Sequence, residues 1–94
     1  MRTIKRTSQF KKDYKREMKG KNGLTLKADL VKALHPLAND EPLSVRYFDH
    51  ALKGNWEDHR DCHLKPDLIL IYRKPDAETL QLVRLGSHSE LGIG

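Results

Sequence analysis

Several features on which familiar enzyme classes depend are missing from this chain. It contains a single cysteine, Cys62, so an internal disulfide and a CxxC zinc or redox motif are both excluded. The phosphate-binding P-loop, the dinucleotide-binding GxGxxG turn and the GxSxG nucleophile elbow are absent as well. None of these motifs can therefore carry the function, and we expect no cofactor.

Long apolar runs are also lacking. None approaches the roughly 20 residues that cross a bilayer, and the start, from Met1 to Arg6, leads into charged sequence rather than the apolar part of a signal peptide. A length of 94 residues suits one domain with a small core. We expect a single domain over residues 1–94 that is located in the cytoplasm and has no contact with a membrane.

Acidic residues are scarce in the first third of the chain. Residues 1–27 have a charge balance of +8, whereas residues 28–94 have a balance of −3. Such an asymmetry favours a polyanion partner, and nucleic acid is the first candidate. A merely solvated helix face, or a surface for an acidic protein, would have the same composition. The basic face that we expect to bind RNA consists of Lys11, Lys12, Lys15, Arg16 and Lys19.

Two helices are predicted in the first half, after a short edge strand over residues 2–6. Thr7 or Ser8 can cap the first helix, whose apolar stripe repeats at helical spacing through Phe10, Tyr14 and Met18. The second helix carries Leu26, Leu30, Leu34 and Leu37 at the same spacing. Because a proline disfavours helical geometry in the residue before it, we expect this helix to end or kink at Pro36.

In the second half of the chain polar and apolar residues alternate, and this pattern predicts an antiparallel meander of three strands. They cover residues 57–64, 68–72 and 79–85, with turns at Lys65-Pro66-Asp67 and Lys74-Pro75-Asp76. The expected fold class is α+β, with two N-terminal helices packed on a mainly antiparallel four-stranded sheet. The order is strand, helix, helix and three strands, followed by a short C-terminal turn or helix.

A dense set of titratable groups, from His50 to Asp67, precedes and borders the apolar strand that ends at Tyr72. The spacing His59-x-Asp61-x-His63 places three possible ligands on one strand face, so zinc or iron must be weighed. Alternating polar residues are common on exposed strands, however, and we favour a site without metal. Histidines titrate near neutral pH and suit general acid–base work.

RNA can be cleaved through its own 2′-hydroxyl without any metal. A base takes the hydroxyl proton, an acid protonates the departing 5′-oxygen, and a cation stabilises the phosphorane. Two histidines and an arginine beside a basic surface supply these groups. A small basic binding module with scattered histidines would have a similar composition, so the residues alone leave both possibilities open.

Three segments of this half carry a resemblance to a known family. They span residues 49–56, 60–72 and 84–88, and together they read DHxLxGxW, RDxHxxPDxxLIY and RxGxH. The chain resembles the YafQ branch of the RelE/ParE toxin superfamily, and its helical half matches in layout and basic character. This resemblance implies a ribosome-dependent endoribonuclease that cuts messenger RNA in the ribosomal A site. It also implies a DinJ-like antitoxin as partner, through which alone the protein would reach operator DNA.

The resemblance also implies the site residues. His50, His63, Asp67 and His88 match the active-site positions of the family, and Arg84 is a candidate for stabilising the phosphorane. We expect His50 or His63 to act as base, His88 as acid or phosphate contact, and Asp67 to orient an imidazole. Leu68 and Leu91 stand where the family has aromatic residues that could position bases. The expected RNA contacts are therefore Arg60, Leu68 and Leu91, in addition to the basic face.

Two other functions remain open at this level. A ParE-like inhibitor of gyrase would share the fold and an antitoxin, but would need no histidine cluster. A catalytically silent RNA-binding module is the other alternative. The set of His50, His63 and His88 argues against both.

Overall fold

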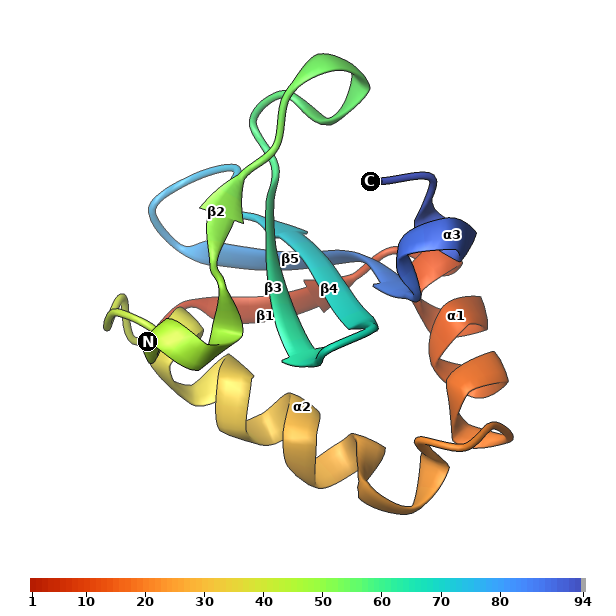
Figure 1. The fold of residues 1–94 in the computed structure, drawn as a ribbon. Coiled ribbons are helices and arrows are strands. Elements are labelled where there is room, and N and C mark those ends of the chain that lie inside the picture. Colours follow the sequence, from red (N-terminus) through yellow and green to blue (C-terminus); the bar gives the residue numbers. More distant parts are fainter. Residues whose placement is uncertain (94) are drawn as a thin grey trace.

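A five-stranded mixed sheet organises the chain in the computed structural model, which describes residues 1–93 (Figure 1). The strand order is β1-β5-β4-β3-β2; β1 pairs with β5 in parallel, and the other pairs are antiparallel. The strands are β1 (Thr3–Arg6), β2 (His50–Ala51), β3 (Arg60–Lys65), β4 (Leu68–Arg73) and β5 (Thr79–Gly86). The helices are α1 (Ser8–Met18), α2 (Gly23–Ala38) and α3 (His88–Leu91), with 3-10 turns at η1 (Val45–Tyr47) and η2 (Gly54–Trp56).

The start of α1 follows the prediction closely. The Thr7 hydroxyl caps the helix by accepting a hydrogen bond from the Phe10 backbone N–H at 2.9 Å, and it donates to the Val83 carbonyl oxygen at 2.8 Å. This one side chain therefore satisfies an orphan amide of the helix and fixes the helix against β5. The aromatic ring of Phe10 is consequently buried over the sheet.

Of the two alternatives predicted at Pro36, an end or a kink of the second helix, the end is wrong. Helix α2 continues through Pro36 to Ala38. A proline inside a helix removes one amide donor, but Leu37 and Ala38 beyond it are 3% and 2% exposed. Burial of these two side chains in the core offsets the loss of that hydrogen bond, so the last turn stays helical.

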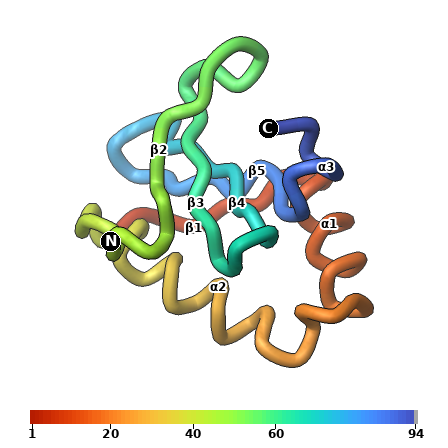
Figure 2. Tube along the Cα trace, in the orientation of Figure 1, coloured from red at the N-terminus to blue at the C-terminus, as the bar shows by residue number. Residues whose placement is uncertain are grey.

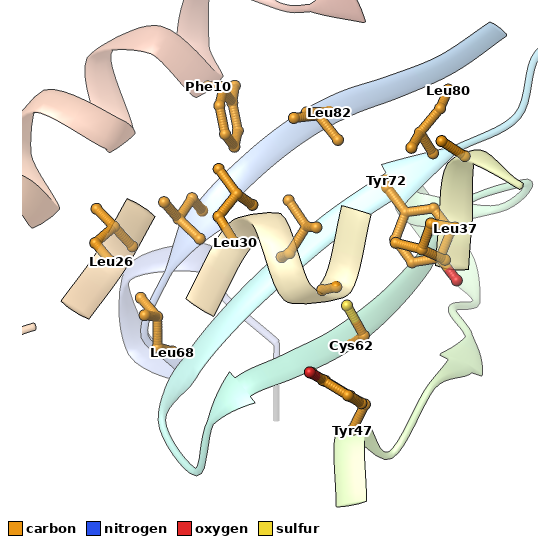
Figure 3. Packing of buried hydrophobic residues seen from close by; sticks show 14 residues of the cluster. Phe10, Leu26, Leu30, Leu37, Tyr47, Cys62, Leu68, Tyr72, Leu80 and Leu82 are labelled. Carbon is orange, nitrogen blue, oxygen red and sulfur yellow. The ribbon is translucent and has the colours of Figure 1, made fainter. Parts of the chain in front are cut away.

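The sheet separates two apolar clusters of unequal size. Helices α1 and α2 cover one face, and the larger cluster lies between them and the sheet, as Figure 3 shows from close by. On the other face a small cluster of Ile69, Ile71 and Leu91 is joined by half-buried Trp56 and Val83. The Leu68–Tyr72 run is buried on both sides for this reason. Within residues 1–93, no helix has both the length and the hydrophobicity of a membrane span.

The predicted sheet needs two corrections of detail. It has five strands rather than four, because the two residues of β2 pair with β3, His50 opposite Asp61 and Ala51 opposite Arg60. The second predicted strand, residues 57–64, begins only at Arg60, because η2 and a turn occupy the residues before it. The tube view in Figure 2 shows how the loop between β2 and β3 rises away from the helices, beside the chain end that follows α3.

Candidate active site

A cavity of about 610 Å³ opens on the face of the sheet that carries α3. All three histidines that the resemblance implied line this cavity, although they come from β2, β3 and α3. Its walls are formed by Phe48, His50, Leu52, Lys53, Asn55, Trp56, Asp61, His63, His88, Gly92 and Ile93. Residues that lie up to 45 positions apart in the sequence thus share one solvent-filled space.

His88 is held by Asp67 and by the geometry of α3. Ser87 and Glu90 form a capping box that begins the helix directly at His88. One carboxylate oxygen of Asp67, in the turn between β3 and β4, accepts from the His88 backbone N–H at 2.9 Å and from Nδ1 at 2.7 Å. These two hydrogen bonds, the backbone bond first, hold the pKa of Asp67 below its usual range. Asp67 is therefore placed as an acceptor that orients the imidazole of His88.

His63 lies between two other rings. The centroid of its imidazole is 5.3 Å from that of His88, with the planes 70° apart in an edge-to-face arrangement. The centroid of the Phe48 ring lies 5.7 Å from that of His63. The pairing of β3 with β4 becomes irregular between His63 and Lys65, at the end of the strand. His63 therefore lines the cavity in contact with the rings of His88 and Phe48.

His50 is oriented by a backbone carbonyl. Its Nδ1 is 2.7 Å from the carbonyl oxygen of Phe48, which can only accept a hydrogen bond. Nδ1 therefore carries the proton, and Nε2 of the neutral ring is the acceptor. An oxygen of Asp61 is also 3.1 Å from Nδ1, but it lacks the alignment of a hydrogen bond and has no partner among residues 1–93.

Asp61 is the site residue that sequence reasoning weighed only as a metal ligand. It is 2% exposed and lines the cavity together with the three histidines. Burial raises its pKa, and the charges of His50, His63 and His88 act in the opposite direction. Its position two residues before His63, on the same strand face, was the signal that could have identified it as part of an acid–base site.

Arg84 is not among the residues that line this cavity. Its guanidinium Nε donates to Asp13 of α1 at 2.8 Å, and only 23% of its side chain is exposed. Asp13 is fully buried and also accepts from the Leu85 backbone N–H at 3.0 Å. Burial opposes the ionisation of Asp13, but the hydrogen bonds, that from Arg84 foremost, lower its pKa overall. Arg84 therefore joins β5 to α1 in the fold.

Of the five residues of the basic face, Arg16 differs from the four lysines because it is paired with Asp13 and Glu90. Lys11, Lys12 and Lys15 of α1 are exposed, as is Lys19 directly after its end. Arg16 is also exposed, but it donates to the Leu85 carbonyl oxygen at 2.8 Å and lies 3.1 Å from both Asp13 and Glu90. Four lysines thus remain for a polyanion, whereas Arg16 has a structural role in connecting α1 with β5 and α3.

The other expected RNA contacts lie outside the site. Leu68 and Leu91 are 0% and 5% exposed, and a side chain without exposed surface cannot stack on a base. Both belong to the core. Arg60 is half-exposed but lies 3.3 Å from Asp49, in a different cavity from the histidines. The aromatic residues that do line the histidine cavity, besides the histidines themselves, are Phe48 and Trp56.

The metal alternative finds little support in the positions of the side chains. His59 does not line the cavity. Its ring packs edge-to-face with that of Trp56 at a centroid distance of 5.4 Å, and its Nδ1 contacts the carbonyl oxygen of Glu57. Across residues 1–93, no three His, Cys, Asp or Glu side chains are gathered closely enough to hold one ion.

The chain is similar over nearly its whole length to proteins of one family. Residues 2–92 match the family model described as the bacterial toxin of type II toxin–antitoxin systems, YafQ. The mRNA interferase toxin YafQ of Escherichia coli K12 is 37% identical over 90 residues, which cover 96% of this chain and 95% of that protein.

Solved structures agree with this match. A metal-bound toxin from Helicobacter pylori is 52% identical, with a TM-score of 0.84 and coverage of 97% of this chain and 99% of that one. The toxin chain of the Escherichia coli DinJ–YafQ complex is 33% identical, with a TM-score of 0.78 and coverage of 97% and 98%.

Proposed function

The chain belongs to the YafQ family of bacterial toxins of type II toxin–antitoxin systems, and from this membership we propose that it is a ribosome-dependent endoribonuclease. It would cut messenger RNA in the ribosomal A site. The observation that supports the reaction is the convergence of His50, His63 and His88 on one cavity. The E. coli relative is named an mRNA interferase toxin. A gyrase inhibitor of the ParE type would need none of these histidines.

The hydrogen bonds of the cavity support a division of the proton-transfer roles. Nδ1 of His50 is occupied by the Phe48 carbonyl, which leaves Nε2 to accept a proton. Nδ1 of His88 donates to Asp67, which leaves Nε2 of His88 to carry the proton that is delivered. We therefore take His50 as the base, His88 as the acid and Asp67 as the residue that orients the acid.

In the proposed reaction His50 removes the proton of the 2′-hydroxyl, the 2′-oxygen attacks phosphorus, and the bond to the 5′-oxygen breaks. His88 protonates the departing oxygen. The products are a 2′,3′-cyclic phosphate upstream and a free 5′-hydroxyl downstream. Lys53 on the cavity wall is the cation that would stabilise the phosphorane, and His63, which lines the same cavity, would donate a hydrogen bond to it. Since Arg84 is engaged with Asp13, we no longer propose it for this role.

The decisive experiment replaces the sugar at the cut site with its 2′-deoxy form. Programmed ribosomes are incubated with the protein, and new messenger 5′ ends are mapped. We expect cleavage of the ribose message only, because the deoxy sugar lacks the nucleophile. Cleavage of the deoxy message would mean that water attacks, and the proposed mechanism would fail. A second arm adds EDTA while enough magnesium remains to keep the ribosome intact, and the rate should not change.

We propose a DinJ-like antitoxin as the partner that neutralises this activity, by analogy with the E. coli complex. Operator DNA would be reached only through that complex. Co-expression of the toxin with its neighbouring small open reading frame should yield a stable complex and restore growth. Persistent toxicity while the partner is bound would contradict this assignment.

A further inference from the structure

We propose that Phe48 is the platform on which a nucleobase beside the cleaved phosphate stacks, and that the groove behind its ring receives that nucleotide. This inference rests on the proposed function and deepens it, since it identifies a residue that positions the substrate in the same site. It begins from the unusual state of the Phe48 side chain.

Phe48 is a large aromatic residue that the fold holds out in solvent. Its side chain is 65% exposed, and its backbone lies in the left-handed region with φ +48. Among residues 1–93, the other non-glycine residues with positive φ are Asp40 and Asp58, and aspartate tolerates this region better than phenylalanine does. Such conformations persist where neighbouring contacts enforce them, and they concentrate at functional sites.

The contacts that enforce this conformation are those of the catalytic cavity. The Phe48 carbonyl oxygen accepts from Nδ1 of His50, the proposed base. The Phe48 N–H donates to the Val45 carbonyl oxygen at 3.0 Å, which closes η1. The ring itself lies 5.7 Å from that of His63. The backbone of this residue thus orients one catalytic histidine while its ring contacts another.

A second groove of about 510 Å³ lies behind the ring and shares Phe48 and His63 with the catalytic cavity. It is completed by Arg46, Tyr47, Leu64, Lys65 and Pro66. A nucleotide that lies across the shared wall would therefore have its phosphate at the histidines and its base against Phe48. Trp56, the other ring of the cavity, is half-buried on the small apolar cluster, which leaves Phe48 as the exposed ring.

The charges of this groove favour a nucleotide over an acidic or neutral peptide. Its lining includes Arg46 and Lys65 and no acidic side chain. Lys65 is paired with Asp29 at 3.1 Å, whereas the exposed Arg46 side chain contacts the ring and the hydroxyl of Tyr47 and has no acidic partner within residues 1–93. An aromatic platform with a nearby guanidinium is the combination that single-stranded nucleic acids use, through base stacking and a phosphate contact.

The test uses a five-nucleotide RNA with 2′-O-methyl sugars throughout and 2-aminopurine at the centre. The methyl groups remove the nucleophile, so the intact protein can be studied without cleavage, and stacking on an aromatic ring quenches the fluorescence of 2-aminopurine. We expect quenching by the unmodified protein and by Phe48→Tyr. For Phe48→Leu we expect loss of quenching and a Kd raised roughly 5- to 100-fold, the range for one base–aromatic stack.

Two variants guard against trivial explanations. Phe48→Asn tolerates the left-handed backbone, so any loss that it shares with Phe48→Leu comes from the missing ring and not from strain. Val45→Ala truncates an exposed apolar residue of the same turn that lines neither groove, and it should bind the probe like the unmodified protein. On ribosomes, Phe48→Leu should raise KM and change the frequency of cut codons, while the pH–rate profile keeps its shape.

Each outcome bears on the proposal in a distinct way. Unchanged quenching by Phe48→Leu, or no quenching by the unmodified protein at millimolar concentration, overturns it. A Phe48→Leu variant that binds the probe normally but loses the antitoxin would make the groove a protein interface, which also overturns it. Quenching that depends on Phe48 in a protein that cuts no message would instead refute the proposed function and leave the nucleotide site in place.

Discussion

Replacement of Asp13 by alanine tests whether the ion cluster beneath β5 holds the fold together. Asp13 is fully buried on α1 and accepts hydrogen bonds from Arg84 Nε at 2.8 Å, the Leu85 N–H at 3.0 Å and Arg16 Nη1 at 3.1 Å. The substitution removes the one carboxylate that, within residues 1–93, accepts hydrogen bonds from all three donors. The buried backbone N–H of Leu85 and the guanidinium groups of Arg84 and Arg16 each lose a hydrogen-bond acceptor.

The expected loss follows from the exposure of those donors. Removal of one partner from a buried ion pair costs about 3–5 kcal/mol. The side chains of Arg84 and Arg16 are 23% and 40% exposed, so water can solvate the two guanidinium groups once Asp13 is gone. We therefore expect the free energy of unfolding to fall by about 2–4 kcal/mol. The free energy of unfolding of a domain of this length is about 5–14 kcal/mol. The variant should therefore still fold, with a Tm lowered by roughly 8–20 °C.

Urea titrations followed by circular dichroism measure this loss at neutral pH, with Glu41→Ala as an exposed carboxylate control. The pH dependence supplies a second check on Asp13. Its pKa is lower in the folded protein than the usual value of 3.8, so its charge stabilises the fold above that value and loses this effect as the pH falls through the folded-state pKa. The parent should therefore be more stable than Asp13→Asn at neutral pH, and the difference in their free energies of unfolding should become smaller below pH 3.8.

A loss smaller than about 1 kcal/mol in Asp13→Ala, the value of an ordinary hydrogen bond, would refute the reasoning. The reasoning would also be refuted if the difference in free energy of unfolding between the parent and Asp13→Asn increased as the solution is acidified. Either result would mean that Arg84 is not held by Asp13 in solution, and its catalytic role would have to be reconsidered.

Two further predictions concern the reaction and the basic face. His88→Ala or His63→Ala should lower the single-turnover cleavage rate by roughly 10²–10⁴-fold and leave ribosome binding intact, and the parent pH–rate profile should be bell-shaped; equal rates in parent and variants would contradict the assignment. The double variant Lys12→Glu and Lys15→Glu should weaken ribosome binding and flatten its salt dependence without moving the cut position. A shifted cut position would mean that this face also selects sequence.

The regular elements of the fold could be predicted because their apolar periodicity is strong. The stripe through Phe10 and the cap at Thr7 located α1, and the continuous run from Leu68 to Tyr72 located the central strand. Sequence patterns did not indicate the parallel pairing of β1 with β5, because parallel register depends on a long connection and not on neighbouring residues. The two residues of β2 are too few for any periodicity to appear.

The sequence indicated which residues could do chemistry better than it indicated which residues are buried. Asp67 and the three histidines could be named because their motif positions correspond to a known family. Leu68 and Leu91 were assigned to RNA by position alone, although Leu68 opens a run that is apolar at every residue and so must be buried on both faces. Phe48 was overlooked because a single aromatic residue in a loop gives no signal until its backbone conformation is known.

The spacing Arg84-x-Gly86-x-His88 has a physical explanation in the same region of the structure. Arg84 is bonded to Asp13 of α1, and His88 begins α3 two residues after the strand ends. A Cβ atom at Gly86 would lie 2.8 Å from Nη2 of Arg16 and 3.2 Å from a carboxylate oxygen of Glu90. Gly86 thus leaves room for the ion pair that ties α1 to α3. The helix that carries the exposed lysines is therefore coupled, through Arg16 and Glu90, to the helix that presents His88.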